Sequence, residues 1–101
     1  MLGARGLEIL LILYKYAKTH NNSELIPLLN AIQEIKGRIS RKTYNKYLKA
    51  VYRLQKNKLI IIEGKFSKKS PLRITLTKEG IKTAETIITQ FETLIKPIIQ
   101  D

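Results

Sequence analysis

A run of polar, mainly basic side chains between residues 41 and 56 is the part of the sequence best suited to bind another molecule. At about 100° per residue these side chains fall on one side of a helix, with no acidic residue among them. We call this set the cationic stripe; its members are Lys42, Asn45, Lys46, Lys49, Arg53 and Lys56. Basic residues three and four apart repel one another, whereas Glu–Lys pairs stabilise a helix. We therefore expect a polyanion to neutralise the stripe; the alternative is the ordinary basic surface of a lysine-rich protein.

Apolar residues of the same segment predict a helix that presents the cationic stripe to solvent. They fall within the opposite arc, as in an amphipathic helix packed on a core, and they are Tyr44, Tyr47, Leu48, Val51 and Leu54. Ser40 is a good N-cap, and Asn57 is a plausible C-terminal stop. The segment is therefore predicted to be a helix from about Arg41 to Lys56.

The positive charge is concentrated in the middle of the chain. The 101 residues carry a formal net charge of +11, and 15 of the 19 Lys and Arg residues lie between Lys36 and Lys82. Only Glu63 and Glu79 oppose them there, so this region should attract anions, with nucleic acid a better fit than a membrane surface. The chain has no cysteine, which excludes disulfides and thiolate metal sites and fits an intracellular location.

Two further helices are predicted before the cationic one. The first runs from Gly3 or Ala4 to Lys18; Glu8 interrupts its apolar run, which predicts neither a signal peptide nor a membrane span. A second helix is expected to start at Ser23 or a neighbour, with Pro27 in its first turn, and to end at Gly37.

A β-hairpin and a long helix are predicted to follow. Leu59 to Ile62 and Leu72 to Thr77 have the short β-branched or alternating patterns of strands. The loop between them carries three lysines that can follow the same anion, namely Lys65, Lys68 and Lys69. The last helix is predicted to begin after a Thr77 cap and to end near Lys96, because proline disfavours helix at the preceding residue.

The first and last helices have more apolar surface than so small a domain is expected to cover. A helix that is apolar nearly all round is buried on most sides. We therefore expect a homodimer seam that includes residues 81–99. The predicted seam residues are Leu7, Ile9, Leu13, Tyr16, Ile87, Phe91, Leu94, Ile95 and Ile98. The alternative for the last helix is that its stripe is intramolecular core.

Nothing in the sequence points to catalysis. His20, the only histidine, lies in a polar turn, and the acidic residues are scattered singly. These residues form no carboxylate pair, no metal-ligand spacing and no phosphate-binding glycine loop. We expect neither an enzyme nor a bound cofactor or metal.

The predicted order of elements resembles the winged helix-turn-helix proteins, a mainly α fold with a small β-hairpin, here a single domain over residues 1–101. The segment Leu76-Thr77-Lys78-Glu79-Gly80 is similar to the junction of wing and last helix in PadR-like and MarR-like regulators. Ser40-Arg41-Lys42-Thr43-Tyr44 resembles the start of their recognition helix. The chain also resembles small dimeric winged-helix proteins of archaea, their viruses and plasmids.

This resemblance implies a cytoplasmic, nucleoid-associated homodimer that binds double-stranded DNA, most simply as a transcriptional regulator. The DNA-binding residues it implies are Ser40, Arg41, Lys42, Thr43, Asn45, Lys46, Lys49, Tyr52, Arg53, Lys65, Lys68 and Lys69. An architectural or plasmid-segregation protein that spreads along DNA through dimer–dimer contacts is the alternative. A winged helix that only docks proteins is a third reading.

Overall fold

A computed structural model describes residues 2–63 and 72–99 of the chain, with side chains described up to Phe91. Its elements, in chain order, are α1 (Gly3–His20), β1 (Ile26–Pro27), α2 (Leu28–Lys36), α3 (Arg41–Lys56), β2 (Ile60–Glu63), β3 (Arg73–Leu76) and α4 (Lys78–Ile99). The described chain is therefore mainly helical with a small antiparallel sheet, which confirms the predicted fold class at this level. No described helix has the length and apolarity needed to cross a bilayer.

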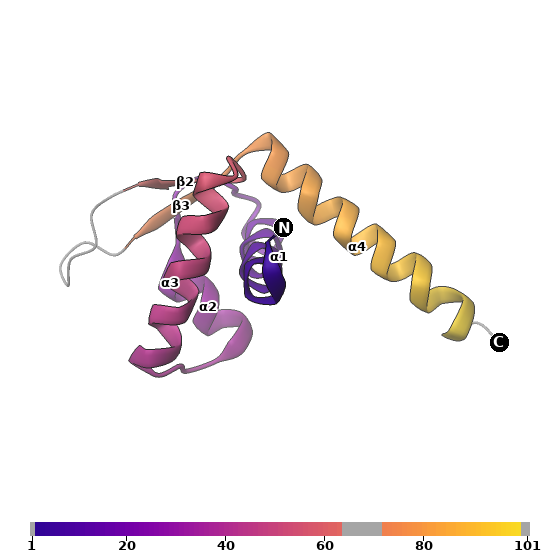
Figure 1. Ribbon diagram of the computed structural model, residues 1–101, viewed down its shortest axis with the longest axis horizontal. Helices are drawn as coiled ribbons and strands as arrows, with labels where there is room; N and C mark the ends of the chain where they lie inside the picture. The colour runs from indigo at the N-terminus through magenta and orange to yellow at the C-terminus, as the bar shows by residue number, and fades with distance from the viewer. Residues whose placement is uncertain (1, 64–71, 100–101) are drawn as a thin grey trace.

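Helix α1 is the central element, and it contacts α2, α3 and α4. Figure 1 shows the first three helices gathered together, with the sheet beside them and α4 leading away. Ile9, Leu10 and Leu13 of α1 are completely buried within this single chain. The prediction that Ile9 and Leu13 face a partner subunit is therefore wrong, because α2, α3 and the sheet supply enough apolar surface to enclose them.

Helix α2 begins at Leu28, so the prediction of a start near Ser23 is wrong. Leu25 has a φ of 50°, which a right-handed helix cannot accommodate. The segment lies along β3 instead: Leu76 N donates to Ser23 O at 2.9 Å, and Leu28 N donates to Leu72 O at 3.1 Å. Pro27 occupies the N-cap position, and Gly37 ends the helix as predicted.

The sheet has three strands in the order β1-β3-β2, one more than the predicted hairpin. Both outer strands are antiparallel to β3, with Ile26 and Ile62 each opposite Ile74. Side chains alternate between the two faces of a sheet. Accordingly Ile60 and Leu76, which are opposite one another, are buried, whereas Ile61 is 49% exposed.

The start of α4 is fixed by a close approach to the end of α3. Thr77 N donates to Leu59 O at 3.1 Å, and the Thr77 hydroxyl lies within 2.9 Å of both Lys58 O and Leu59 O. The same hydroxyl accepts a bond from Gly80 N at 3.0 Å, which confirms the predicted cap. A Cβ at Gly80 would overlap the Leu59 carbonyl oxygen, so only glycine fits here.

Of the α4 residues whose side chains are described, those in the first turns pack on the body. Ala84 is buried, and Ile81 and Ile87 contact the core from its edge. Phe91 is 62% exposed, and the whole molecule measures 51 × 28 × 27 Å because α4 projects from it (Figure 1). The helix reaches Ile99, so the predicted end near Lys96 is wrong. Proline disfavours but does not forbid helix before it, and losing one hydrogen bond costs least near a helix end.

We expect Gly80→Ala to lower the free energy of unfolding by about 1–3 kcal/mol, because the added methyl group forces α4 away from the Leu59 carbonyl. Urea unfolding followed by circular dichroism measures this loss. Lys82→Ala is the control in the same helix; Lys82 is exposed, so its replacement should change stability by less than about 0.5 kcal/mol. Equal stabilities of the two variants would contradict the role given to Gly80.

Candidate nucleic-acid interface

Helix α3 starts and stops where the sequence predicts. Thr43 N donates to Ser40 Oγ at 3.2 Å, and Ser40 Oγ donates to Thr43 Oγ1 at 3.0 Å. The Ser40 proton is thus used within the cap, which leaves the Thr43 hydroxyl as the better donor to an incoming anion. At the other end, Asn57 is the C-cap.

The turn after α3 is a Schellman motif. Leu59 N donates to Leu54 O and Lys58 N to Gln55 O, while Leu54 and Leu59 are both buried. Lys58 takes the left-handed position with φ of 63°, where glycine is usual. The Gln55 side chain accepts a bond from Ile62 N at 2.7 Å, which fixes β2 to α3.

The apolar side of α3 faces the core, as its periodicity predicts. Tyr47, Val51 and Leu54 are buried at 2% exposure or less, and Tyr44 and Leu48 pack at the edge. Burying each of these large side chains contributes about 1.5–3 kcal/mol. Like-charge pairs on the other side cost about 0.2–0.5 kcal/mol each. The packing therefore determines how α3 is oriented, and the cationic stripe follows from it.

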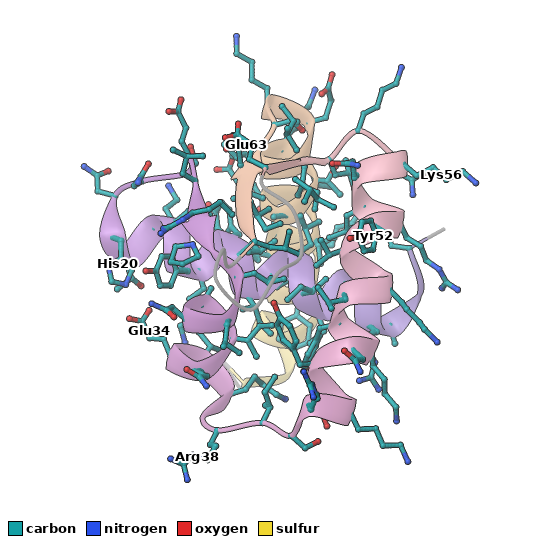
Figure 2. All side chains as sticks on the ribbon, turned by 90° about the vertical axis from the view of Figure 1, so that its left-hand side faces the viewer. His20, Glu34, Arg38, Tyr52, Lys56 and Glu63 are labelled. Carbon is teal, nitrogen blue, oxygen red and sulfur yellow. The ribbon has the colours of Figure 1, made fainter. Side chains whose placement is uncertain are left out.

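The opposite side of α3 is exposed and cationic. The exposed residues of α3 are Arg41, Lys42, Asn45, Lys46, Lys49, Tyr52, Arg53, Gln55 and Lys56. Figure 2 shows nitrogen-tipped side chains projecting from the outer side of α3, with Lys56 at one end and Tyr52 near it. The two ion pairs between described residues are Lys36–Glu8 and His20–Glu34, and neither involves α3. The stripe therefore has no carboxylate partner within the described part of the chain.

Glu8 joins the three helices of the body, a role that sequence reasoning missed. Tyr47 of α3 donates its hydroxyl proton to Glu8 Oε1, and Lys36 Nζ at the end of α2 lies 3.2 Å from the same oxygen. We call this set of three side chains the Glu8 clasp. The sequence shows Glu8 only as a break in an apolar run, and its partners Lys36 and Tyr47 lie too far away along the chain for local spacing to reveal them.

The contacts within the Glu8 clasp also shift the pKa values of Tyr47 and Glu8. Burial, followed by the hydrogen bond and charge of Glu8, raises the pKa of Tyr47 to about 12. The hydrogen bond from Tyr47 and the proximity of Lys36 lower the pKa of Glu8 below its ordinary value of 4.5, against the opposing effect of burial. At neutral pH Tyr47 is therefore a donor and Glu8 an ionised acceptor.

His20 is the last residue of α1, so the predicted helix end at Lys18 and the placement of His20 in a polar turn are wrong. The His20 ring stacks on Tyr16 with centroids 4.0 Å apart, and His20 Nε2 lies 2.8 Å from Glu34 Oε1. These contacts tie the end of α1 to α2. Within residues 2–63 and 72–99, no group of three or more His, Cys, Asp or Glu side chains could hold a metal ion.

The predicted seam residues have different surroundings in the structure. Tyr16 is half-buried against His20, and Ile87 contacts the core, whereas Leu7 is 37% and Phe91 62% exposed. Only Leu7 and Phe91 of the described seam residues are thus open apolar surface. The side chains of Leu94, Ile95 and Ile98 lie outside the described part of the chain, as do Lys65, Lys68 and Lys69 of the predicted wing.

Comparison of the chain with protein-family models, with curated proteins and with solved structures gave no match. The function proposed for the interface therefore rests on its own residues.

We expect Tyr47→Phe to lower the free energy of unfolding at pH 7 by about 1–2 kcal/mol, since it removes a hydrogen bond to a partly exposed carboxylate. The folded state lowers the pKa of Glu8, so this stabilisation exists above the ordinary value of 4.5 and is lost as pH falls through the folded-state pKa. The difference between wild type and variant should therefore be smaller at the lowest pH at which both proteins still fold than at pH 7.

Urea unfolding at the two pH values measures both effects. Tyr52→Phe is the matched control, because the Tyr52 side chain is 51% exposed. A difference between wild type and Tyr47→Phe that stays equally large at every pH below 7 at which both proteins fold would argue against the clasp.

Proposed function

We propose that the chain binds double-stranded DNA as a winged helix-turn-helix homodimer, with α3 as its recognition helix. The observation that carries the proposal is the exposure of the whole cationic stripe without a carboxylate partner among the described residues. A duplex supplies a regular array of negative charge that relieves the repulsion along the stripe. The combination of four helices, including the basic α3, with a small three-stranded sheet is compatible with a winged helix.

The position of each residue along α3 determines which part of the DNA it would contact. Arg41, Lys42, Asn45 and Lys46 lie in the first two turns, where side chains would reach base edges in the major groove. Arg and Lys can donate to guanine, and Asn can pair with adenine. Lys49, Tyr52 and Arg53 follow further along α3 and would contact phosphates, together with the Thr43 hydroxyl and the wing lysines Lys65, Lys68 and Lys69. Ser40 would contribute as the cap that positions Thr43.

The proposal that the protein is a dimer rests on α4. This 22-residue helix projects beyond the body, and Phe91 is exposed on it. We propose that α4 packs against α4 of a second copy of the chain. A two-fold contact would place two identical helices against one another and cover the apolar surface of both. The pair of recognition helices would then read a roughly palindromic site with half-sites about 34 Å apart. Such a regulator acts in the cytoplasm, on the nucleoid.

We expect the affinity for duplex DNA to fall steeply with salt. If the dimer neutralises about ten phosphates, a plot of log K against log salt should have a slope near −9. Lys42→Ala should reduce the preference for a selected site over random DNA, whereas Arg53→Gln should weaken both alike and flatten the slope by about one for each phosphate that is no longer neutralised. Fluorescence anisotropy with DNA selected from a random pool measures these quantities. A wild-type protein that binds no duplex at about 50 mM salt would refute the proposal.

The same protein–DNA complex distinguishes a regulator from a protein that coats DNA. A footprint of about 20 base pairs that stays constant with protein concentration fits one dimer on two half-sites. A footprint that lengthens with concentration would instead support the spreading, architectural alternative.

We expect Phe91→Glu to shift the protein from dimer to monomer, because a buried unpaired carboxylate is strongly unfavourable in an apolar seam. Sedimentation equilibrium measures the mass. Gln90→Glu adds the same charge at the neighbouring exposed position and should leave the dimer intact. A monomeric wild type, or a Phe91→Glu variant that still dimerises, would contradict the proposed seam.

A further inference from the structure

A pocket of about 250 Å³ lies between the beginning of α1 and the middle of α3. Residues 2–6, which are the N-cap and first turn of α1, form one wall, and Lys46, Lys49, Ala50 and Arg53 form the other. The pocket is therefore continuous with the cationic stripe but brings in a part of the chain that is distant in sequence.

Four cations surround this pocket: Arg5, Lys46, Lys49 and Arg53. The guanidinium carbon of Arg5 lies 5.5 Å from the centroid of the Tyr47 ring, which is a cation–π contact. The nearest acid along α1, Glu8, is bound to Tyr47 and Lys36. The first turn of α1 contains no acidic residue, so the positive end of the helix adds to the potential of the side chains.

We propose that a phosphate group of the DNA backbone binds in this pocket, which makes Arg5 a DNA-contact residue outside the helix-turn-helix. The inference rests on the proposed function, since the same duplex would have to reach both α3 and the start of α1. Lys49 and Arg53 line the pocket and are also the α3 residues placed on phosphates. Arginine suits such a site because its planar guanidinium can bind two phosphate oxygens at once.

The first test compares Arg5→Gln with Lys15→Gln on a random-sequence duplex of about 30 base pairs. Lys15 is exposed on the same helix, about 15 Å further along the axis, so it is a matched loss of one charge. Arg5→Gln should weaken binding about three- to tenfold at ~100 mM salt and make the salt slope less negative by about one per subunit. Lys15→Gln should bind like wild type.

The second test separates binding from folding. Ala4 lies in the pocket wall and is exposed, and Ala4→Glu places a carboxylate there. An acid in the first turn stabilises a helix. The thermal midpoint of Ala4→Glu should therefore equal or exceed that of wild type while its DNA affinity falls at least as much as that of Arg5→Gln. Ala4→Gln should keep both properties near wild type.

The outcomes distinguish the two proposals. If wild type binds duplex DNA but Arg5→Gln and Ala4→Glu match their controls, the pocket is not a phosphate site, and the role of α3 stands. If wild type binds no duplex, the proposed function itself fails.

Discussion

The structure depends on how α3 is seated against α1. Tyr47, Val51 and Leu54 of α3 are buried in the core that also holds Ile9, Leu10 and Leu13 of α1, and the Tyr47 hydroxyl is bound to Glu8. Because the side chains of a helix keep fixed angular positions, this seating leaves the cationic stripe only one direction in which to point. Nothing on the exposed side of α3 is needed to hold that orientation.

The repulsion between the positive charges on that exposed side therefore destabilises the folded protein. Four pairs of like charges along α3 destabilise it by about 1 kcal/mol in total, less than the burial of a single core side chain provides. The protein can thus maintain a repulsive surface without unfolding. Binding a polyanion would remove this repulsion and release counterions from the polyanion, which is the physical basis of the proposed affinity for DNA.

Local patterns allowed α3 and its ends to be predicted from the sequence. The period of its apolar residues, the Ser40 cap and the Asn57 stop each depend on neighbours within four residues. The resemblance to a junction between wing and last helix drew attention to Gly80, but its close approach to the Leu59 carbonyl became visible only in the structure.

Features that depend on distant residues could not be predicted in the same way. Strand β1 contains only Ile26 and Pro27, and Leu25 beside it is held by Thr75, fifty residues away. These contacts with β3 hold the segment after Ser23 in an extended conformation, although its sequence pattern predicts a helix. The burial of Ile9 and Leu13, the Glu8 clasp and the pocket beside Arg5 likewise arise from packing α1 against the rest of the chain.

The central claim is that the outward side of α3 is the surface that meets a DNA duplex. Titration of the isotope-labelled protein with a duplex, followed through its backbone amide resonances, tests this claim residue by residue. We expect the largest shift changes between Ser40 and Arg53, with smaller ones at residues 2–6. Changes confined to α4 or to the outer face of the sheet would contradict it.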